Sequence, residues 1–346
     1  MTLRTMVMVA AAVLAAGCGG AATAPPPSAS AAPLTPATIK VSLPGLMPAF
    51  SQSDIAVAQA NGFFKDQDLT VQTQGLASGV QTVQSVIAGD SDIGASSVEP
   101  VLAAAAQGSL EIIGSYADRL PVVMETPSTI SKPADLKGKQ LGIQTVGAFR
   151  EIMTRFVYQG AGLTQDDVHY VPVADTGYVG ALLAHRIDSA ILQQEQSVDA
   201  ERRDPSLHVL VDLSKTLPSY FYGTFFVKSD WLQAHQDVAV RFLTAITKAH
   251  RLIYSDRARV VPQIATATGF SADVIGTAYD RLIAKDGVFA VNEGLETKRL
   301  QYTVGRMQSG GLLPAGPPDL SKVVDRAPIH QAVQRLGVMT GDPRWH

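Results

Sequence analysis

Short apolar strands alternate with amphipathic helices twice along the chain, and this repeated alternation constrains the fold more than any other feature. One run covers residues 38–125 and a second covers residues 140–211. Elements of these lengths are typical of a mostly parallel sheet with helices on both faces. Residues 83–95 and 180–190 share a helix, a tight polar turn and an adjacent Ile and Asp that enter a strand. The sequence therefore predicts an α/β protein with two similar lobes.

The same patterns predict the individual strands and helices. We expect strands at 38–43, 69–74, 92–95, 110–115, 121–125, 140–144, 168–171, 187–192, 207–211 and 225–227. We expect helices at 51–61, 78–88, 98–107, 147–159, 177–185, 195–203, 230–235, 237–255, 257–268, 272–285, 293–309 and 327–336. The late helices are expected to cover a sheet or brace the two lobes.

These elements predict how the chain is divided. Residues 38–126 and 224–346 are expected to form a discontinuous first lobe, and residues 127–223 the second. Two segments between the lobes, 127–133 and 215–223, are the predicted hinges.

The N-terminal residues have the order of a secretory signal. One early charge at Arg4 is followed by an apolar run and small residues, which predicts a signal peptide over 1–17. Residues 14–18 end in Cys18 and are similar to the site at which bacterial lipoproteins are cleaved and lipidated. Residues 18–37 are rich in Pro and Ala and predict a flexible tether. An ordinary signal peptide with a chance cysteine, and a tail without a purpose, are the alternatives.

Composition excludes several classes of function. The 346 residues are 46% hydrophobic and 17% charged, with a net charge of −3 and no basic patch, which argues against nucleic acid as a partner. Cys18 is the only cysteine, so the folded part has no disulfide and depends on its hydrophobic core. After residue 17 no stretch is long and apolar enough to span a membrane.

Motifs of catalysis, metal binding and cofactor binding are missing from the sequence. It has no HExxH, CxxC, GxSxG, phosphate loop or GxGxxG after the first strand. None of the seven histidines has another at a helical ligand spacing, and each is expected to be a surface residue. We therefore expect no metal, no cofactor and no enzyme activity.

Several segments together resemble the substrate-binding proteins of ABC importers for nitrate, sulfonates, taurine and the pyrimidine precursors of thiamine. These segments are 60–66, 69–71, 88–94, 135–139, 141–143, 162–164 and Val168. The resemblance covers roughly residues 38–313. It implies a two-lobed periplasmic-binding-protein fold, with two crossover strands and a ligand between the lobes.

Loops that follow strands are the expected ligand site, because open α/β sheets bind ligands at the carboxyl ends of their strands. These loops are 44–52, 75–79, 96–99, 116–119, 145–150, 175–178 and 193–194. The candidate ligand-binding residues within or beside them are Phe50, Gln52, Ser78, Ser96, Ser97, Glu99, Tyr116, Thr145, Gly147, Ala148, Asp175, Gln193 and Tyr222.

Each candidate has a structural alternative. The serines and Thr145 are equally suited to cap helices, and the aromatic residues are equally suited to the core. Arg119 and Arg150 are expected to be solvated rather than bound to an anion. Because Glu99 and Asp175 would favour a cation or a hydrogen-bond donor, the charge of the ligand stays open.

The predicted function is that of an exported solute-binding lipoprotein, a monomer anchored through Cys18 to the outer face of the bacterial cell membrane. It would capture a small organic molecule or oxyanion and deliver it to an ABC permease and ATPase complex. One alternative is a ligand-sensing envelope receptor. The other is an enzyme like the thiamine-pyrimidine synthases, whose cysteine-rich motif this chain lacks.

Overall fold

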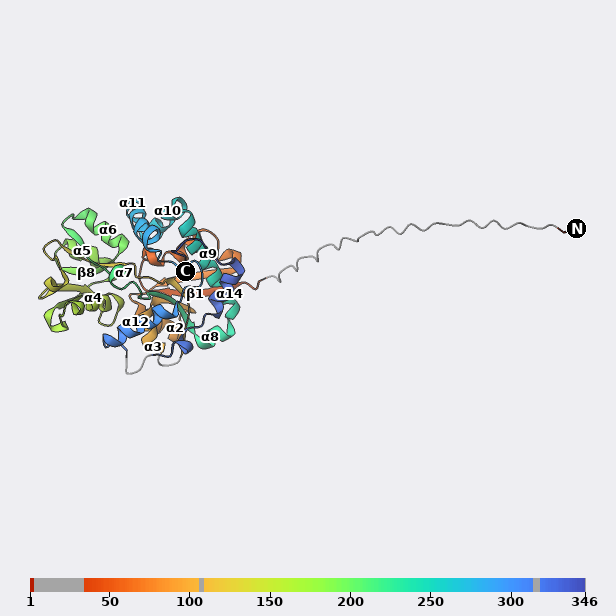
Figure 1. Ribbon diagram of the computed structural model, residues 1–346, viewed down its shortest axis with the longest axis horizontal. Helices are drawn as coiled ribbons and strands as arrows, with labels where there is room; N and C mark the ends of the chain where they lie inside the picture. Colours follow the sequence, from red (N-terminus) through yellow and green to blue (C-terminus); the bar gives the residue numbers. More distant parts are fainter. Residues whose placement is uncertain (3–33, 106–108, 314–317, 346) are drawn as a thin grey trace. The chain divides into compact units, whose positions relative to one another are not determined.

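The computed structural model describes residues 1–2, 34–105, 109–313 and 318–345. The predicted signal peptide, Cys18 and most of the predicted tether lie outside the described residues. Residues Thr35–His346 form one compact unit, which carries all the helices and strands discussed below (Figure 1).

The first sheet is built mainly from the N-terminal third of the chain. Its strands are β1 (Ala37–Leu43), β2 (Leu69–Gly75), β3 (Ile93–Ser97), β4 (Leu110–Ala117) and β10 (Gly223–Lys228), in the order β2-β1-β3-β10-β4. β1 is parallel to β2 and β3, whereas β10 is antiparallel to β3 and β4. The alternating burial of β1 buries Ile39 and Val41, as its sequence predicted.

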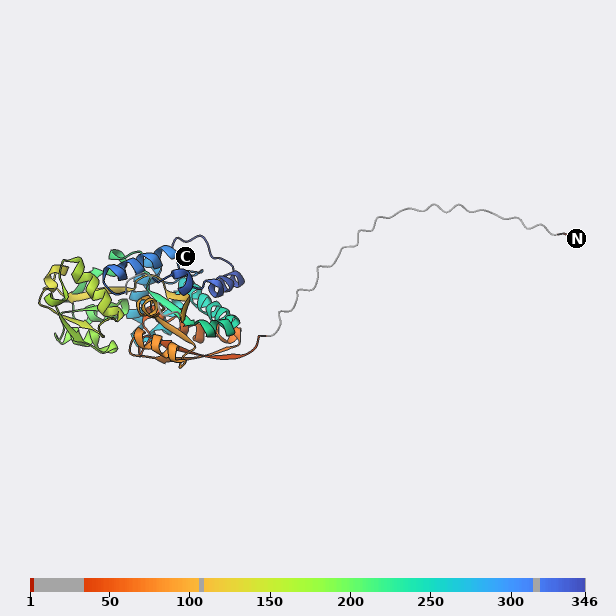
Figure 2. The same cartoon turned by 90° about the horizontal axis from the view of Figure 1, so that it is seen from below.

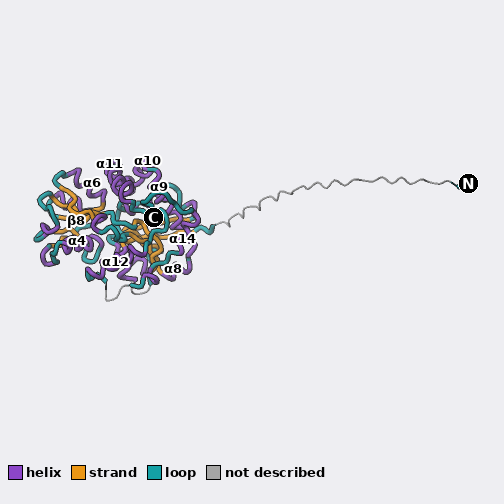
Figure 3. The backbone as a smooth tube through the Cα atoms, in the orientation of Figure 1, coloured by secondary structure: helices purple, strands orange, loops and turns teal. Residues whose placement is uncertain are grey.

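The second sheet repeats this topology. Its strands are β5 (Val122–Pro127), β6 (Gln140–Ile143), β7 (His169–Pro172), β8 (Ser189–Gln193) and β9 (Leu207–Asp212), in the order β7-β6-β8-β5-β9. β6 is parallel to β7 and β8, and β5 is antiparallel to β8 and β9. The strands form two separate groups in Figure 3. The predicted two-lobed α/β fold is therefore confirmed.

The places where the chain crosses between the sheets correct two predictions. Residues 121–125 were expected to complete the first lobe, but β5 pairs with β8 and β9 in the second sheet. The chain therefore crosses between the sheets at 118–121 and again at 213–222. The predicted hinge at 127–133 is wrong, because it follows β5 on the second lobe, whereas the hinge at 215–223 lies in the second crossing. Strand patterning identified β5 but carries no information about which sheet receives it.

Helices cover the sheets at the predicted places, with shifted ends. They are α1 (Asp54–Ala60), α2 (Gly79–Ala88), α3 (Val98–Ala105), α4 (Phe149–Gly160), α5 (Tyr178–Leu183), α6 (Gln194–Arg203), α7 (Leu213–Thr216), α8 (Ser229–Ala234), α9 (Gln236–Ser255), α10 (Arg257–Thr268), α11 (Ala272–Tyr279), α12 (Thr297–Ser309), α13 (Leu320–Val323) and α14 (Ala327–Leu336). α4 and α5 belong to the second lobe, and α9 and α14 pack together on the first (Figures 1 and 2).

Three helix boundaries differ clearly from the prediction, and two short helices were not predicted. A 3₁₀ turn at Phe50–Gln52 precedes α1, so the helix expected from residue 51 begins at Asp54. The helix expected over 272–285 becomes a π-helical turn after Tyr279. α12 starts at Thr297 rather than 293, and α7 and α13 were not predicted because one helical turn carries no periodic pattern.

A buried Asp–His pair supports the first lobe and corrects the prediction that every histidine lies at the surface. His250 on α9 is 2% exposed, and its Nε2 lies 3.1 Å from Asp54 Oδ2 at the start of α1. Its Nδ1 lies 2.7 Å from the Ala290 carbonyl oxygen, so that nitrogen donates. Burial raises the pKa of the Asp54 carboxyl. The pair ties α1 to α9 and to the 288–291 segment, where Phe289 packs on the imidazole.

Candidate functional site

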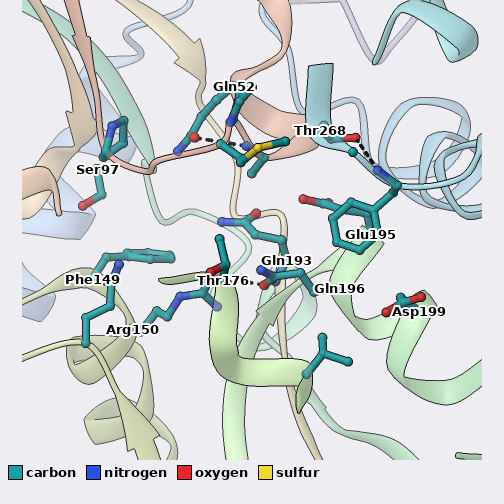
Figure 4. A pocket seen from close by; sticks show the side chains of 18 of the residues that line it. Gln52, Ser97, Phe149, Arg150, Thr176, Gln193, Glu195, Gln196, Asp199 and Thr268 are labelled. Atoms are coloured by element: carbon teal, nitrogen blue, oxygen red, sulfur yellow. Dashed lines mark hydrogen bonds between the residues drawn. The ribbon is translucent and has the colours of Figure 1, made fainter. Parts of the chain in front are cut away.

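A cavity of about 480 Å³ lies between the two lobes. Each of the seven predicted loops contributes at least one lining residue, as do α5, α6 and the junction after α10. In Figure 4, Gln52 and Thr268 lie on one side of the cavity, and Arg150, Gln196 and Asp199 lie on the opposite side. The carboxyl ends of both sheets therefore face one shared space, as expected for a ligand site of this fold.

The wall from the first lobe is polar and aromatic. Gln52 and Ser97 are buried, at 6% and 4% exposure, and Tyr116 is fully enclosed at the end of β4. The Tyr116 ring packs edge-on against Tyr222, with ring centroids 5.6 Å apart. A Cβ at Gly223, the first residue of β10, would overlap the Tyr116 ring, so this position favours glycine. The packing of the two tyrosine rings therefore depends on the backbone at the start of β10.

Arg150 dominates the wall from the second lobe, and its place corrects the prediction that it is solvated. Its side chain is 5% exposed and lies over the Tyr178 ring, 4.2 Å from the centroid. It donates to the carbonyl oxygen of Ile191 and, at 3.1 Å, to Gln196 Oε1. α4 begins at Phe149, at the edge of the cavity, and therefore places the Arg150 side chain in the cavity wall.

Hydrogen bonds cross the cavity floor and join the lobes. Gln193 Nε2, at the end of β8, donates to the Tyr222 hydroxyl at 3.2 Å, and Ser51 Oγ donates to Gln193 Oε1 at 3.5 Å. The Phe50 backbone N–H donates to Glu195 Oε1 at 3.1 Å. The lobes are therefore held in a closed arrangement by direct polar contacts.

Five of the thirteen predicted ligand-binding residues line the cavity. They are Gln52, Ser97, Tyr116, Gln193 and Tyr222. Burial raises the pKa of the Tyr222 hydroxyl, although hydrogen bonds from Gln193 and Tyr116 oppose the shift. Burial likewise raises the pKa of Tyr116. Both hydroxyls are therefore neutral at physiological pH and can donate as well as accept.

Seven other predicted residues do not line the cavity. They are Phe50, Ser78, Ser96, Glu99, Thr145, Gly147 and Ala148. Phe50 is enclosed by the rings of Tyr279 and Phe289, with centroids 6.3 and 6.4 Å away. Glu99 is 1% exposed and accepts from the Tyr220 hydroxyl at 2.7 Å. Burial raises the pKa of the Glu99 carboxyl. These side chains pack behind the cavity wall.

Local backbone structure explains the positions of most of the other predicted ligand-binding residues. Ser78 Oγ accepts from the Gln81 N–H at 3.3 Å and caps α2, as its structural alternative predicted. The Ala148 N–H donates to the backbone carbonyl oxygen of the exposed Thr145 at 3.2 Å, and the Gly147 N–H donates to Glu151 Oε2 at 3.0 Å. Ser96 is fully buried in β3. Asp175 lies in a 3₁₀ turn, and its side chain is outside the described part.

Residues of α6 were missed by the sequence analysis. Glu195, Gln196, Asp199 and Arg203 all line the cavity. The loop prediction stopped at residue 194, and these four continue along the helix from that loop. Their i, i+1, i+4 and i+8 spacing places them on one helical face, which could have identified them.

The described residues contain no cluster of three or more His, Cys, Asp or Glu side chains able to hold a metal ion. Within the same residues, no helix is long and apolar enough to cross a membrane.

Comparison with known families gives a match over more than half of the chain. The family model described as NMT1/THI5 like matches residues 50–258, which include both crossings between the sheets and all the cavity loops from Phe50 to Gln194. The chain belongs to this family. A relative of this NMT1/THI5-like protein in Bacillus subtilis (strain 168), named "Putative binding protein YtlA", is 22% identical over 275 residues, which cover 76% of this chain and 80% of the relative.

Solved structures share the fold of this NMT1/THI5-like protein. The alkanesulfonate-binding protein SsuA from Xanthomonas axonopodis pv. citri, bound to MOPS, aligns with a TM-score of 0.69 and 19% identity over 84% of this chain and 99% of its own. The periplasmic nitrate-binding protein NrtA from Synechocystis PCC 6803 aligns with a TM-score of 0.71 and 13% identity, over 87% and 89%. Both are similar in their two-lobed architecture.

Proposed function

We propose that this protein captures a small molecule between its lobes and delivers it to an ABC import complex without altering it chemically. The observation that carries the proposal is the cavity of about 480 Å³, to which both lobes contribute buried polar side chains. Its volume lies within the usual range of small-molecule sites. A ligand that contacts both lobes only when they are closed stabilises the closed state, and no covalent step is needed.

The lining favours a neutral or zwitterionic ligand that carries a ring. Arg150 and Arg203 contribute two cations, and Glu195 and Asp199 contribute two carboxylates, so the charges offset each other. Aromatic side chains, among them Phe149, offer faces for stacking. A ligand with a single negative charge, such as a bare oxyanion, would be attracted by the two arginines but repelled by the two carboxylates.

The first test is a thermal-shift and calorimetric screen of the purified chain against taurine, methanesulfonate, nitrate, benzoate and an aminopyrimidine. A ligand at 100 times its dissociation constant stabilises a protein by about 2.7 kcal/mol, which raises the Tm by several degrees. Phe149→Ala, in the cavity, is expected to weaken binding at least tenfold. Phe63→Ala, on a half-buried ring packed beside Lys248, is the matched control.

The screen also defines failure. If no compound binds, and small-angle scattering detects no compaction with cell extract, the proposed function is wrong. If a compound binds and Phe149→Ala has no effect, the ligand occupies a different site.

Export and anchoring are parts of the same proposal. Residues 1–17 would direct secretion, Cys18 would carry the lipid, and residues 18–37 would tether a monomeric receptor to the outer face of the membrane. We further propose that the lobes are residues 35–117 with 223–346, and residues 122–212. Labelling with palmitate in cells is expected for the wild type and absent for Cys18→Ala. Palmitate incorporated equally by both would refute the anchor.

A further inference from the structure

A second concavity lies beside α12, away from the cavity between the lobes. This α4–α12 groove has a volume of about 530 Å³, and its floor is apolar, with Phe156, Val157, Leu213 and Leu217 buried along it. Lys132 and Arg306 are also among its lining residues. α12 lies next to α4 in Figure 1, and Arg155 of α4 donates to the Gly310 carbonyl oxygen at 3.5 Å. The groove shares no lining residue with the cavity.

Arg306 is the distinctive group of this groove. Its guanidinium lies over the Phe156 ring, 4.9 Å from the centroid. Within the described residues no hydrogen bond or ion pair reaches this guanidinium, and its Nε is a buried atom without a hydrogen-bond partner. Burying such a donor without an acceptor costs free energy, which an anionic ligand would recover.

The charge of the groove has one sign. Among the residues that the structure describes, Lys132 and Arg306 are its charged lining residues, and neither aspartate nor glutamate lines it. The nearby Asp135 carboxylate is already engaged with the backbone N–H groups of Ser131 and Lys132, at 3.0 and 3.1 Å. An apolar floor beside two cations complements a molecule with an apolar body and one anionic end.

We propose that the α4–α12 groove binds a soluble organic anion of this kind, a medium-chain or aryl carboxylate, with the carboxylate on Arg306 and the apolar body along Phe156 and Leu213. The volume suits a small molecule. This site is independent of the ligand proposed for the cavity between the lobes.

The test is isothermal titration of decanoate into the purified full chain. Arg306→Gln removes the charge and is expected to weaken binding about tenfold or more. Gly160→Leu fills the groove from the end of α4, where a Cβ at Gly160 meets no atom within 4 Å, and is expected to abolish binding. Lys298→Gln, exposed on the same helix, is the charge control and is expected to bind like the wild type.

Three outcomes would overturn the proposal. One is equal decanoate affinity in the wild type, Arg306→Gln and Gly160→Leu, with circular dichroism confirming that all three fold. A second is equal affinity for decylamine, which shares the apolar body but has the opposite charge. A third is binding only to phosphatidylglycerol vesicles, because this would identify a membrane surface. Unchanged decanoate binding by Phe149→Ala separates the groove from the cavity.

Discussion

The hydrogen bond from Gln193 to Tyr222 gives a quantitative prediction for Tyr222→Phe. The substitution keeps the ring, which packs on Tyr116 and on Phe149 with centroids 5.6 and 4.7 Å away, and removes only the hydroxyl. Gln193 is 5% exposed, so its amide loses its acceptor while it is still largely enclosed by protein. An unsatisfied buried donor costs about 1–3 kcal/mol.

This cost falls on the closed state alone. Gln193 belongs to the second lobe and Tyr222 to the second crossing, so separating the lobes exposes both groups to water. The closed-to-open ratio of the ligand-free protein is therefore expected to fall roughly 5- to 150-fold. Any ligand that selects the closed state loses affinity by up to the same factor.

The ratio can be measured by pulsed electron resonance between spin labels on cysteines introduced at Gln84 and Asp166. Both positions are exposed, one on each lobe, and Cys18 is replaced by alanine. The matched control is Tyr254→Phe, which loses a hydrogen bond to the Phe289 carbonyl oxygen at 2.9 Å within the first lobe. Tyr222→Phe should broaden the distances toward longer values, and the control should not. Identical distributions for all three proteins would refute the reasoning.

Three predictions concern stability, each measured by urea denaturation. Asp54→Ala should lower the free energy of unfolding by about 3–5 kcal/mol, because it leaves the buried His250 without its carboxylate partner. Asp66→Ala, in an exposed ion pair with Lys248, should lower it by at most about 1 kcal/mol. Equal losses would contradict this. Burial raises the pKa of Glu125 from 4.5 to about 7. Between these two values the folded state keeps a proton that the unfolded state has lost. The free energy of unfolding should therefore fall by up to about 3 kcal/mol as the pH rises from 4.5 to 7. Glu125→Gln should remove that fall, and an unchanged pH profile would show that the carboxyl is not its source. Gly223→Ala should lower the free energy of unfolding by about 1–3 kcal/mol, because it displaces the Tyr116 ring. Gly305→Ala, in open space on α12, should raise it by about 0.5–1 kcal/mol. Equal effects would count against the predicted clash.

Periodicity predicted the strands and helices well because one buried face repeats at a fixed spacing in each element. It could not assign β5 to a sheet, because a strand has the same pattern in whichever sheet it joins. Local rules offered the cap at Ser78 only as the alternative to ligand contact, and could not choose between the two. The buried His250 was missed because its partner, Asp54, lies 196 positions away in sequence.

The candidate ligand site shows the same contrast between what local patterns predict and what depends on long-range contacts. The topological rule for strand ends identified loops that do line the cavity, since it depends only on the order of the elements. It could not decide which side chains turn inward. Glu99 faces Tyr220, and Arg150, which was expected to be solvated, is buried over Tyr178.

The central claim is that one small molecule is held by both lobes at once. A crystal structure of the protein with the ligand from the binding screen tests it most directly. The account predicts the ligand between Gln52 of the first lobe and Arg150 and Gln196 of the second, with contacts to each lobe. A ligand held by one lobe alone, or outside this cavity, would contradict it.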